Sequence, residues 1–314
     1  MPSPLIWTVT VALLLVLFAF DFIVQARKAH EPSTREAALW CGGYFALALV
    51  FGAAMAVWWD SARATEFVAG YVTELSLSVD NLFVFLLIMS RNRIPRERQQ
   101  KVLLLGIAIA LAARAVFIFL GAAVINAFSW TFYLFGAYLV FVALRLAFQK
   151  EESHDVEPET ESRMARLLSR WLPVTRQFHG GALVAREGGK LLATPILLAL
   201  VTLGLTDVLF ALDSIPAIYG LTDQSYIVLT ANAFALMGLR QLYFLIGGLL
   251  DRLVYLSYGL AAILVFIGAK LILHAAHESG AGVPEISTPL SLAVIASVLV
   301  VVVAASLVKT RGPR

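Results

Sequence analysis

The sequence predicts an all-α fold, a polytopic membrane helical bundle of about nine transmembrane helices. Three observations predict it. The 314 residues are 60% hydrophobic and only 14% charged, whereas a soluble protein carries about 25% charged residues. The apolar residues gather in stretches of the length that a membrane-spanning helix needs. Two groups of three stretches also carry the same polar landmarks in the same order. The composition excludes both a soluble domain and a disordered chain.

The predicted spans follow from the apolar stretches. The first of them is not expected to be a cleaved signal peptide, because the residues before it, Met-Pro-Ser-Pro, include no basic one. A single cysteine, Cys41, excludes a disulfide framework and a cysteine-rich metal site. The spans run roughly over 5–25, 38–59, 67–90, 102–124, 129–148, 192–220, 226–249, 253–273 and 288–308.

The basic residues orient these spans, because cytoplasmic loops retain Lys and Arg. With the N-terminus outside, all but four of the 24 basic residues fall on the cytoplasmic side. Nine spans then place the C-terminus in the cytoplasm. The exceptions are Arg63, Arg114, Arg240 and Lys270.

The loop over 149–191 is the one sizeable predicted segment outside the membrane. It begins with an acidic, proline-containing stretch, and residues 163–172 then alternate apolar and basic residues at helical spacing. This pattern predicts an amphipathic helix, either in the membrane interface or packed against the base of the bundle. A tight turn is expected over 187–190. Nothing in the loop resembles a catalytic domain, and no nucleic-acid partner is expected.

Two spans carry the same motif. In each, an acid is followed by five mostly apolar residues, a second acid and a small polar residue. A charge at the bilayer centre costs at least about 2.5–3.5 kcal/mol, so such residues are functional candidates by default. The two copies are Glu74, Asp80 and Asn81 in the third span, and Asp207, Asp213 and Ser214 in the sixth.

The similarity continues downstream of both motifs. Arg114 and Arg240 each precede a glycine by seven residues, and Leu-Val-Phe follows in the next span of each copy. A unit of three spans is odd, so the second copy enters the membrane from the opposite side. Inverted repeats are typical of transporters that bind substrate near the midplane. The predicted segments are two N-terminal helices (1–66), the first repeat (67–148), the loop (149–191), the second repeat (192–273) and a final helix with a basic tail (274–314).

Helical geometry leaves the arrangement of the acids open. At 100° per residue, Glu74 and Asn81 share a face, whereas Asp80 lies about 120° from Glu74. Either the helix unwinds locally, or each acid faces a different partner. Pro216 predicts a break in the sixth span, which would free a backbone carbonyl near Asp213.

Ligand chemistry favours a hard cation at this interface. Carboxylate, amide and carbonyl oxygens suit Mg, Ca or Mn. We predict a metal site made by Asp80, Asn81, Asp213 and Ser214, with Glu74 and Asp207 flanking it. Arg114 and Arg240 are expected to pair with acids, in a supporting or a purely structural role. Four deep carboxylates against these two arginines leave a formal charge of −2, which one divalent cation would neutralise. Asp21 is expected to be structural.

At these residues the sequence resembles the TerC family of bacterial membrane proteins, including its Alx-type members. The resemblance rests on the motif that begins at Glu74, on Thr194-Pro195, on the stretch from Asp207 through Pro216, and on the stretch from Asn232 through Arg240. It implies Mn²⁺ export, a fold similar to that of LysE-type exporters, a bacterial inner-membrane location, and a metal path formed by the acids and their polar neighbours.

The leading hypothesis is therefore a secondary transporter that exports a divalent cation, above all Mn²⁺, by alternating access, with protons as a plausible coupling ion. No P-loop is present to indicate ATP hydrolysis, and no resident cofactor is expected. The alternatives are export of Ca²⁺, Mg²⁺ or an amino acid, and a membrane partner that supports metalation of exported proteins. An enzyme is not expected, because neither Asp80 nor Asp213 follows the Gly-x-Gly that intramembrane aspartyl proteases present.

Overall fold

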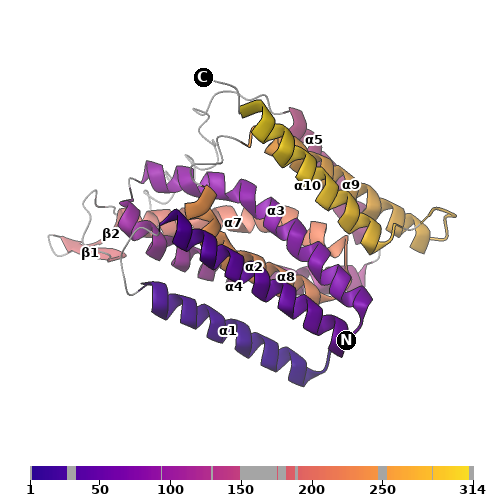
Figure 1. Ribbon diagram of the computed structural model, residues 1–314, viewed down its shortest axis with the longest axis horizontal. Coiled ribbons are helices and arrows are strands. Elements are labelled where there is room, and N and C mark those ends of the chain that lie inside the picture. The colour runs from indigo at the N-terminus through magenta and orange to yellow at the C-terminus, as the bar shows by residue number, and fades with distance from the viewer. Residues whose placement is uncertain are drawn as a thin grey trace.

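The computed structural model describes residues 2–26, 33–92, 94–128, 130–148, 175, 182–187, 190–246, 253–284 and 286–310. Within these residues the chain forms nine helices and a two-stranded hairpin (Figure 1). The helices are α1 (Pro4–Ala26), α2 (Thr34–Trp58), α3 (Ser61–Arg91), α4 (Arg96–Ala127), α5 (Thr131–Phe148), α7 (Pro195–Tyr219), α8 (Ser225–Ile246), α9 (Leu256–Glu278) and α10 (Thr288–Thr310).

The helices begin where the sequence provides caps. Asp60 precedes α3, and its carboxylate accepts a hydrogen bond from the Arg63 amide. Thr194 precedes α7 and accepts one from the Leu197 amide, with Pro195 in the first helical position. Both patterns satisfy amide groups that a helix N-terminus leaves unpaired.

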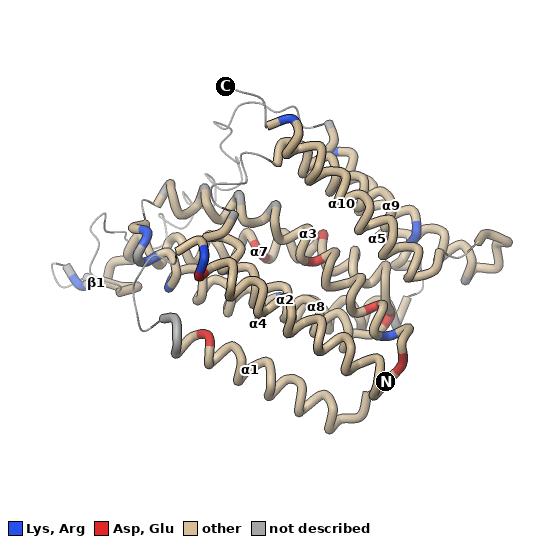
Figure 2. The backbone as a smooth tube through the Cα atoms, in the orientation of Figure 1, with Lys and Arg blue, Asp and Glu red and all other residues tan. Residues whose placement is uncertain are grey.

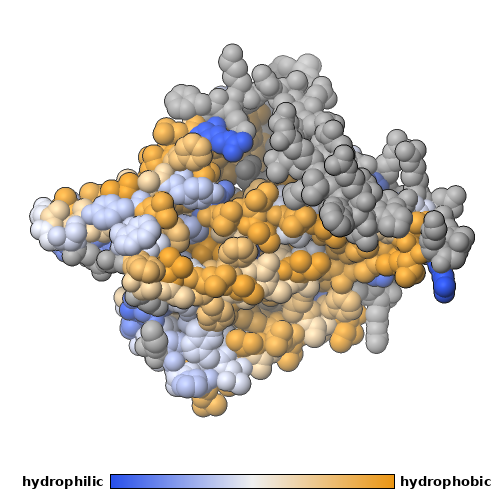
Figure 3. All heavy atoms as spheres, turned by 180° about the vertical axis from the view of Figure 1, so that it is seen from behind, coloured by the Kyte–Doolittle hydropathy of each residue, from blue (hydrophilic) through white to orange (hydrophobic). Residues whose placement is uncertain are grey.

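Eight of the nine described helices are long and apolar enough to cross a membrane, and α5 is a shorter apolar helix over Thr131–Ala147. The prediction of a polytopic helical membrane protein is confirmed. Large apolar side chains such as Leu15, Val57 and Val301 are exposed, and apolar residues dominate the face in Figure 3. A soluble protein would bury such surface. By contrast, the hydrophobic segment of α8 is almost wholly buried.

Charged residues are distributed unevenly along the bundle. Several Lys and Arg residues lie at the end that carries the hairpin, and acids lie along the middle of α3 and α7 as well as toward the bundle ends (Figure 2). A concentration of basic residues at one end is the pattern that the positive-inside rule produces. The midpoints of α3 and α7 therefore place carboxylates deep in the apolar region.

Helix neighbours have the pattern that a two-fold relation would give. α3 packs along α8, α4 packs along α7, and α5 packs along α9. Exchanging the two predicted three-helix copies turns the α3–α8 pair into the α7–α4 pair and leaves the α5–α9 pair unchanged. These contacts fit a two-fold relation between the copies. The inverted repeat and the division of the chain into five segments stay predictions.

The α5–α9 pair is antiparallel and very close. A Cβ atom on Gly136 would lie 2.7 Å from the Gly268 carbonyl oxygen, and one on Gly268 would lie 2.8 Å from the Gly136 carbonyl oxygen. Small residues let membrane helices approach in this way. The surrounding cluster includes the buried Ala143 and Ala261, which extend the small-residue contact along both helices.

A short hairpin was not expected in the all-α prediction. β1 (Val184–Glu187) pairs antiparallel with β2 (Lys190–Ala193), with Glu187 opposite Lys190. The ends of the turn predicted over 187–190 belong to these two strands, and its central residues, 188 and 189, lie outside the described part of the chain. The acidic stretch and the amphipathic helix predicted over 163–172 lie outside the described residues.

The break predicted at Pro216 is wrong. α7 continues through Pro216 to Tyr219. Pro216 donates no hydrogen bond to the Leu212 carbonyl. It still accepts one from the Gly220 amide at 2.9 Å, and its turn is buried among neighbouring helices, so the helix continues. α3 is likewise unbroken from Ser61 to Arg91. The acids therefore project from regular helices.

Candidate functional site

Arg114 is the centre of a fully buried polar network. Its Nε and Nη2 atoms donate to the two carboxylate oxygens of Asp207, each at 2.9 Å. Its Nη1 atom donates to Asn232 Oδ1 at 2.9 Å and also to a carboxylate oxygen of Glu74. All four side chains are buried. The bidentate contact between Arg114 and Asp207 is among the strongest charge-assisted hydrogen bonds, and it fixes the plane of the guanidinium.

The network joins the two predicted repeats. Glu74 and Arg114 come from α3 and α4, whereas Asp207 and Asn232 come from α7 and α8. Two carboxylates against one guanidinium leave a formal charge of −1. The second carboxylate oxygen of Glu74 is buried without a hydrogen-bond partner among the described residues. Of the two carboxylates, Glu74 is therefore the less completely bonded.

Arg240 belongs to a second buried cluster. It donates to Asp21 Oδ1 at 2.7 Å, and the Tyr44 hydroxyl donates to the same oxygen at 2.5 Å. This cluster joins α8 to α1 and α2. The predicted charge balance set Arg240 against the four motif acids, but Arg240 forms an ion pair with Asp21, an acid outside that set. The balance of −2 is thus corrected, because helix packing turns Arg240 toward α1.

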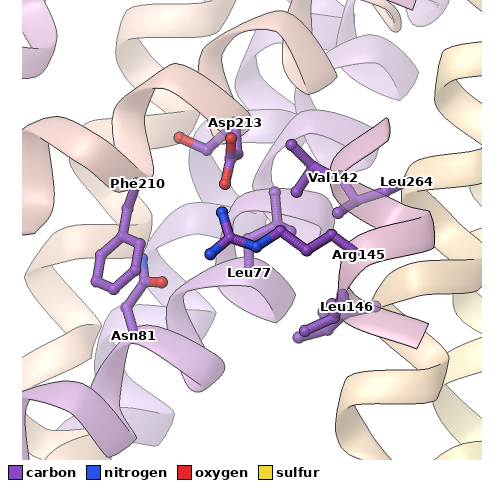
Figure 4. A pocket seen from close by; sticks show the side chains of 10 residues that line it. Leu77, Asn81, Val142, Arg145, Leu146, Phe210, Asp213 and Leu264 are labelled. Atoms are coloured by element: carbon purple, nitrogen blue, oxygen red, sulfur yellow. The ribbon is translucent and has the colours of Figure 1, made fainter. Parts of the chain in front are cut away.

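A cavity of about 290 Å³ adjoins the Arg114 network at Ser214. Its walls are largely apolar, with polar groups at one side (Figure 4). Asp213 and Ser214 of α7 and Asn81 of α3 contribute its oxygen and amide groups. Asp213 is half-buried and accepts a hydrogen bond from the Tyr138 hydroxyl at 2.7 Å. The full lining is Leu77, Asn81, Val142, Arg145, Leu146, Phe210, Asp213, Ser214, Leu260 and Leu264.

The six predicted ligand residues divide between two places. Glu74 and Asp207 bind Arg114, whereas Asn81, Asp213 and Ser214 line the cavity. Ser214 borders both, because it also lies 3.4 Å from Arg114 Nη1. The side chain of Asp80 lies outside the described part. Among the described residues, no group of three or more His, Cys, Asp or Glu side chains is placed to hold a metal ion.

Three further residues belong to this region, although sequence reasoning did not single them out as site residues. Asn232 accepts from Arg114, Tyr138 donates to Asp213, and Arg145 lines the cavity. The sequence carries one signal for Arg145, because it follows the Leu-Val-Phe of the first repeat by four residues, as Lys270 follows that of the second.

A separate cluster connects α3 to the turn between α7 and α8. Arg63 contacts Asp223 at 3.0 Å and Glu66 at 2.9 Å, and the Thr222 hydroxyl donates to Glu66 at 2.6 Å. Partial desolvation acts to raise the pKa of Asp223, but the hydrogen bonds from Gln224 and Arg63 outweigh it. The pKa therefore lies below its usual value near 3.8.

Comparison with known proteins identifies the family. The family described as "Integral membrane protein TerC family" matches residues 59–314. An uncharacterized membrane protein of Mycobacterium tuberculosis is 48% identical over 99% of this chain and 81% of its own length. One of Myxococcus xanthus is 42% identical over 98% of this chain and 94% of its own length.

A relative with a more specific name comes from Escherichia coli. This protein, named as the membrane-bound redox modulator Alx, is 37% identical over 86% of each chain. No solved structure matches the chain. The family match covers both acidic motifs, the Arg114 network and the cavity, and these relatives align with most of the chain. The chain therefore belongs to the TerC family of integral membrane proteins.

Proposed function

We propose that this protein is a secondary transporter that exports a divalent metal cation, with Mn²⁺ as the first candidate, from the cytoplasm by alternating access. The observation that carries the proposal is the cavity at the interface of the predicted repeats, where a carboxylate, an amide and a hydroxyl face one space. Oxygen groups of this kind suit Mn²⁺, Mg²⁺ and Ca²⁺. A site between inverted repeats is also where secondary transporters bind their cargo.

The position of the cavity agrees with uptake from the cytoplasm. Arg145 and Leu146 lie near the end of α5, and Leu260 lies near the start of α9. In the predicted orientation these helix ends face the cytoplasm. We propose proton exchange as the coupling, since protonation of the carboxylates would weaken their hold on a cation.

The name of the Alx relatives suggests a redox function, but this chain offers little thiol chemistry for one. Cys41 is its only cysteine, so no disulfide can form within the chain. A redox function by that route would need a thiol from another molecule. We therefore propose a carrier rather than an enzyme, and the lipid bilayer and the cation as its partners.

A second candidate cargo is a small zwitterion such as an amino acid. The observation that favours it is Arg145, whose guanidinium enters the cavity opposite Asp213 (Figure 4). A guanidinium binds carboxylates, and a carboxylate binds ammonium groups. The two charges would then hold the two ends of one molecule.

Reconstituted protein tests the proposal. Vesicles loaded with a metal-sensitive dye should show Mn²⁺ flux, and the flux should respond to an imposed pH gradient. Asp213→Asn should reduce this flux by at least tenfold, whereas Asp223→Asn, the same change in an exposed turn, should not. Flux of Ca²⁺, Mg²⁺ or an amino acid without Mn²⁺ would identify another cargo. Equal flux in both variants would place the site elsewhere.

A further inference from the structure

The cavity has a positively charged residue on its wall. Arg145 extends from α5, and its guanidinium points toward Asp213 of α7 and Asn81 of α3 (Figure 4). Arg145 is exposed, whereas Asp213 is half-buried. A guanidinium at this position opposes entry of a cation, so its presence in a cation path needs an explanation.

An arginine at this position would ordinarily extend into the headgroup region of the membrane. Arg145 lies in the last turn of α5, where a basic residue is favoured by the helix dipole and by the cytoplasmic interface. Those effects are satisfied when the side chain extends into the headgroup region. Arg145 instead turns inward to the cavity.

The same face of α5 bears a second group directed to Asp213. Tyr138 precedes Arg145 by seven residues, which is close to two helical turns. Its hydroxyl donates to Asp213 at 2.7 Å. α5 thus presents both a hydrogen-bond donor and a charge toward one carboxylate of α7.

The other guanidinium of this region is already bound. Arg114 donates to Asp207 through two nitrogen atoms and to Glu74 through a third. Its charge is therefore shared by two carboxylates other than Asp213. Within the described lining of the cavity, Arg145 supplies the positive charge and Asp213 the negative charge.

We propose that Arg145 is a tethered counter-ion of Asp213, which neutralises this carboxylate while the cavity is empty and gives up its place to the transported cation. This inference rests on the proposed export function and specifies how the same site is regulated. After the cation has left, an exporter must return to the cytoplasm-facing state, and a carboxylate that has not taken up a proton then needs another counter-charge. A lone carboxylate in the membrane interior is costly, and Arg145 removes that cost during the return.

The bound and empty states then differ in one side-chain position. When a divalent cation binds Asp213, repulsion drives the guanidinium toward the cytoplasmic headgroups, which its long side chain can reach. When the cation leaves on the other side, the guanidinium moves back to Asp213. Arg145 therefore weakens binding of the cation and accelerates the return of the empty transporter.

Two modes of transport by reconstituted protein separate these effects. Net Mn²⁺ export requires the empty return, whereas exchange of Mn²⁺ for Mn²⁺ across the vesicle membrane does not. In Arg145→Gln we expect the KM for Mn²⁺ to fall by about tenfold, because a charge–charge repulsion at the site is lost. Net export at saturating Mn²⁺ should fall by about tenfold, because the Asp213 carboxylate then lacks its counter-ion during the return without cation. Exchange should stay near the parental rate.

Two further variants control for structure and charge. Arg145→Lys keeps the positive charge and should retain both modes within about threefold. Arg186→Gln makes the same change on β1, away from the cavity, and should match the parent. Because Arg145 is exposed, its variants should elute from size exclusion as the parent does. If Arg145→Gln does not, Arg145→Lys and equilibrium binding of Mn²⁺ by the detergent-solubilised variant decide the question.

Three outcomes would overturn the proposal. Equal KM and net export in Arg145→Gln and Arg186→Gln would show that Arg145 does not act on the site. Equal loss of net export and exchange would show that it serves the structure. A higher KM with loss of both modes would show that Arg145 binds an anionic group of the cargo. Failure of the proposed function is distinct, because the parent itself would then move no Mn²⁺ in either mode.

Discussion

Arg114 shows how one residue can be committed to the structure of a membrane interior. Its guanidinium binds two acids and one amide, all buried. In water such a pair would contribute little, but removal of one partner from a buried pair typically costs about 3–5 kcal/mol, because the other charge is left uncompensated. Arg240 also forms a buried ion pair, but with Asp21.

Loss of the Arg114 charge should therefore destabilise the protein strongly. We expect Arg114→Gln to lower the free energy of unfolding by about 3–5 kcal/mol. Adding Asp207→Asn should recover part of that loss, since one uncompensated carboxylate is removed. Unfolding in detergent measures the effect, with Arg186→Gln as the control. A variant as stable as this control would contradict the role described for Arg114.

The Arg63–Asp223 pair predicts a small dependence of stability on pH. Because the pKa of Asp223 is lowered in the folded protein, the pair stabilises the fold above the ordinary pKa near 3.8 and loses this contribution as the pH falls through the folded value. Asp223 is exposed and Arg63 is partly buried, so the contribution of the pair to stability is at most about 0.5 kcal/mol.

Asp223→Asn tests this sign. The variant should be slightly less stable than the parent at pH 7. The stabilities of the two proteins should converge when the pH is lowered below the pKa of Asp223 in the folded protein. Melting temperatures at several pH values measure the difference. A gap that widened in acid would show that the pKa shift has the opposite direction.

At the level of elements, the close contact of α5 and α9 depends on missing side chains. Each glycine of the pair would place a Cβ atom against the backbone of the other helix. In membranes, where lipid is as apolar as the helices, such close packing is a main source of association. Since α5 also carries Tyr138 and Arg145, this contact also fixes the position of one wall of the cavity.

Gly136→Ala should therefore be destabilising, by about 1–3 kcal/mol for forced overpacking. Gly42→Ala offers a matched control in α2, where nothing lies within 4 Å of an added Cβ. There the better helix propensity of Ala should raise stability by up to about 1 kcal/mol. Thermal unfolding of both variants in detergent compares them. If both changed in the same direction, the α5–α9 contact would not limit the approach of these helices.

For the molecule as a whole, the orientation in the membrane can be tested through the single cysteine. After Cys41→Ala, cysteines can be introduced one at a time as Arg186→Cys on the hairpin and Asp223→Cys in the α7–α8 turn. We expect an impermeant thiol reagent to label Asp223→Cys from outside intact cells, and Arg186→Cys only in inside-out vesicles. The reverse pattern would show that the predicted orientation is wrong.

The sequence predicted the helices well because a membrane span is defined by length and apolarity alone. The hairpin was missed for the opposite reason. Its strands have four residues each, and such short segments depend on their surroundings more than on their own pattern. Pro216 misled the prediction, since a membrane helix can continue through a proline when its neighbours accommodate the change, and the sequence does not show those neighbours.

Only part of the candidate site could be predicted from the sequence. The residue types and their depth were visible, but their partners depend on how each helix is rotated. Glu74 faces Arg114, and Arg240 faces Asp21 rather than a motif acid. Arg145 satisfied the positive-inside rule equally well as a loop residue or as a cavity residue. Its direction follows from the packing of α5 against α9, which no local pattern records.

The Arg114 network has one mechanical consequence. Its hydrogen bonds tie α3 and α4 to α7 and α8 at mid-depth. Displacement in a rigid rotation grows with distance from the axis. A rocking motion that leaves these bonds intact must therefore have its axis close to the Arg114 guanidinium. The residue would then act as a pivot, at which the two halves of the protein turn without separating.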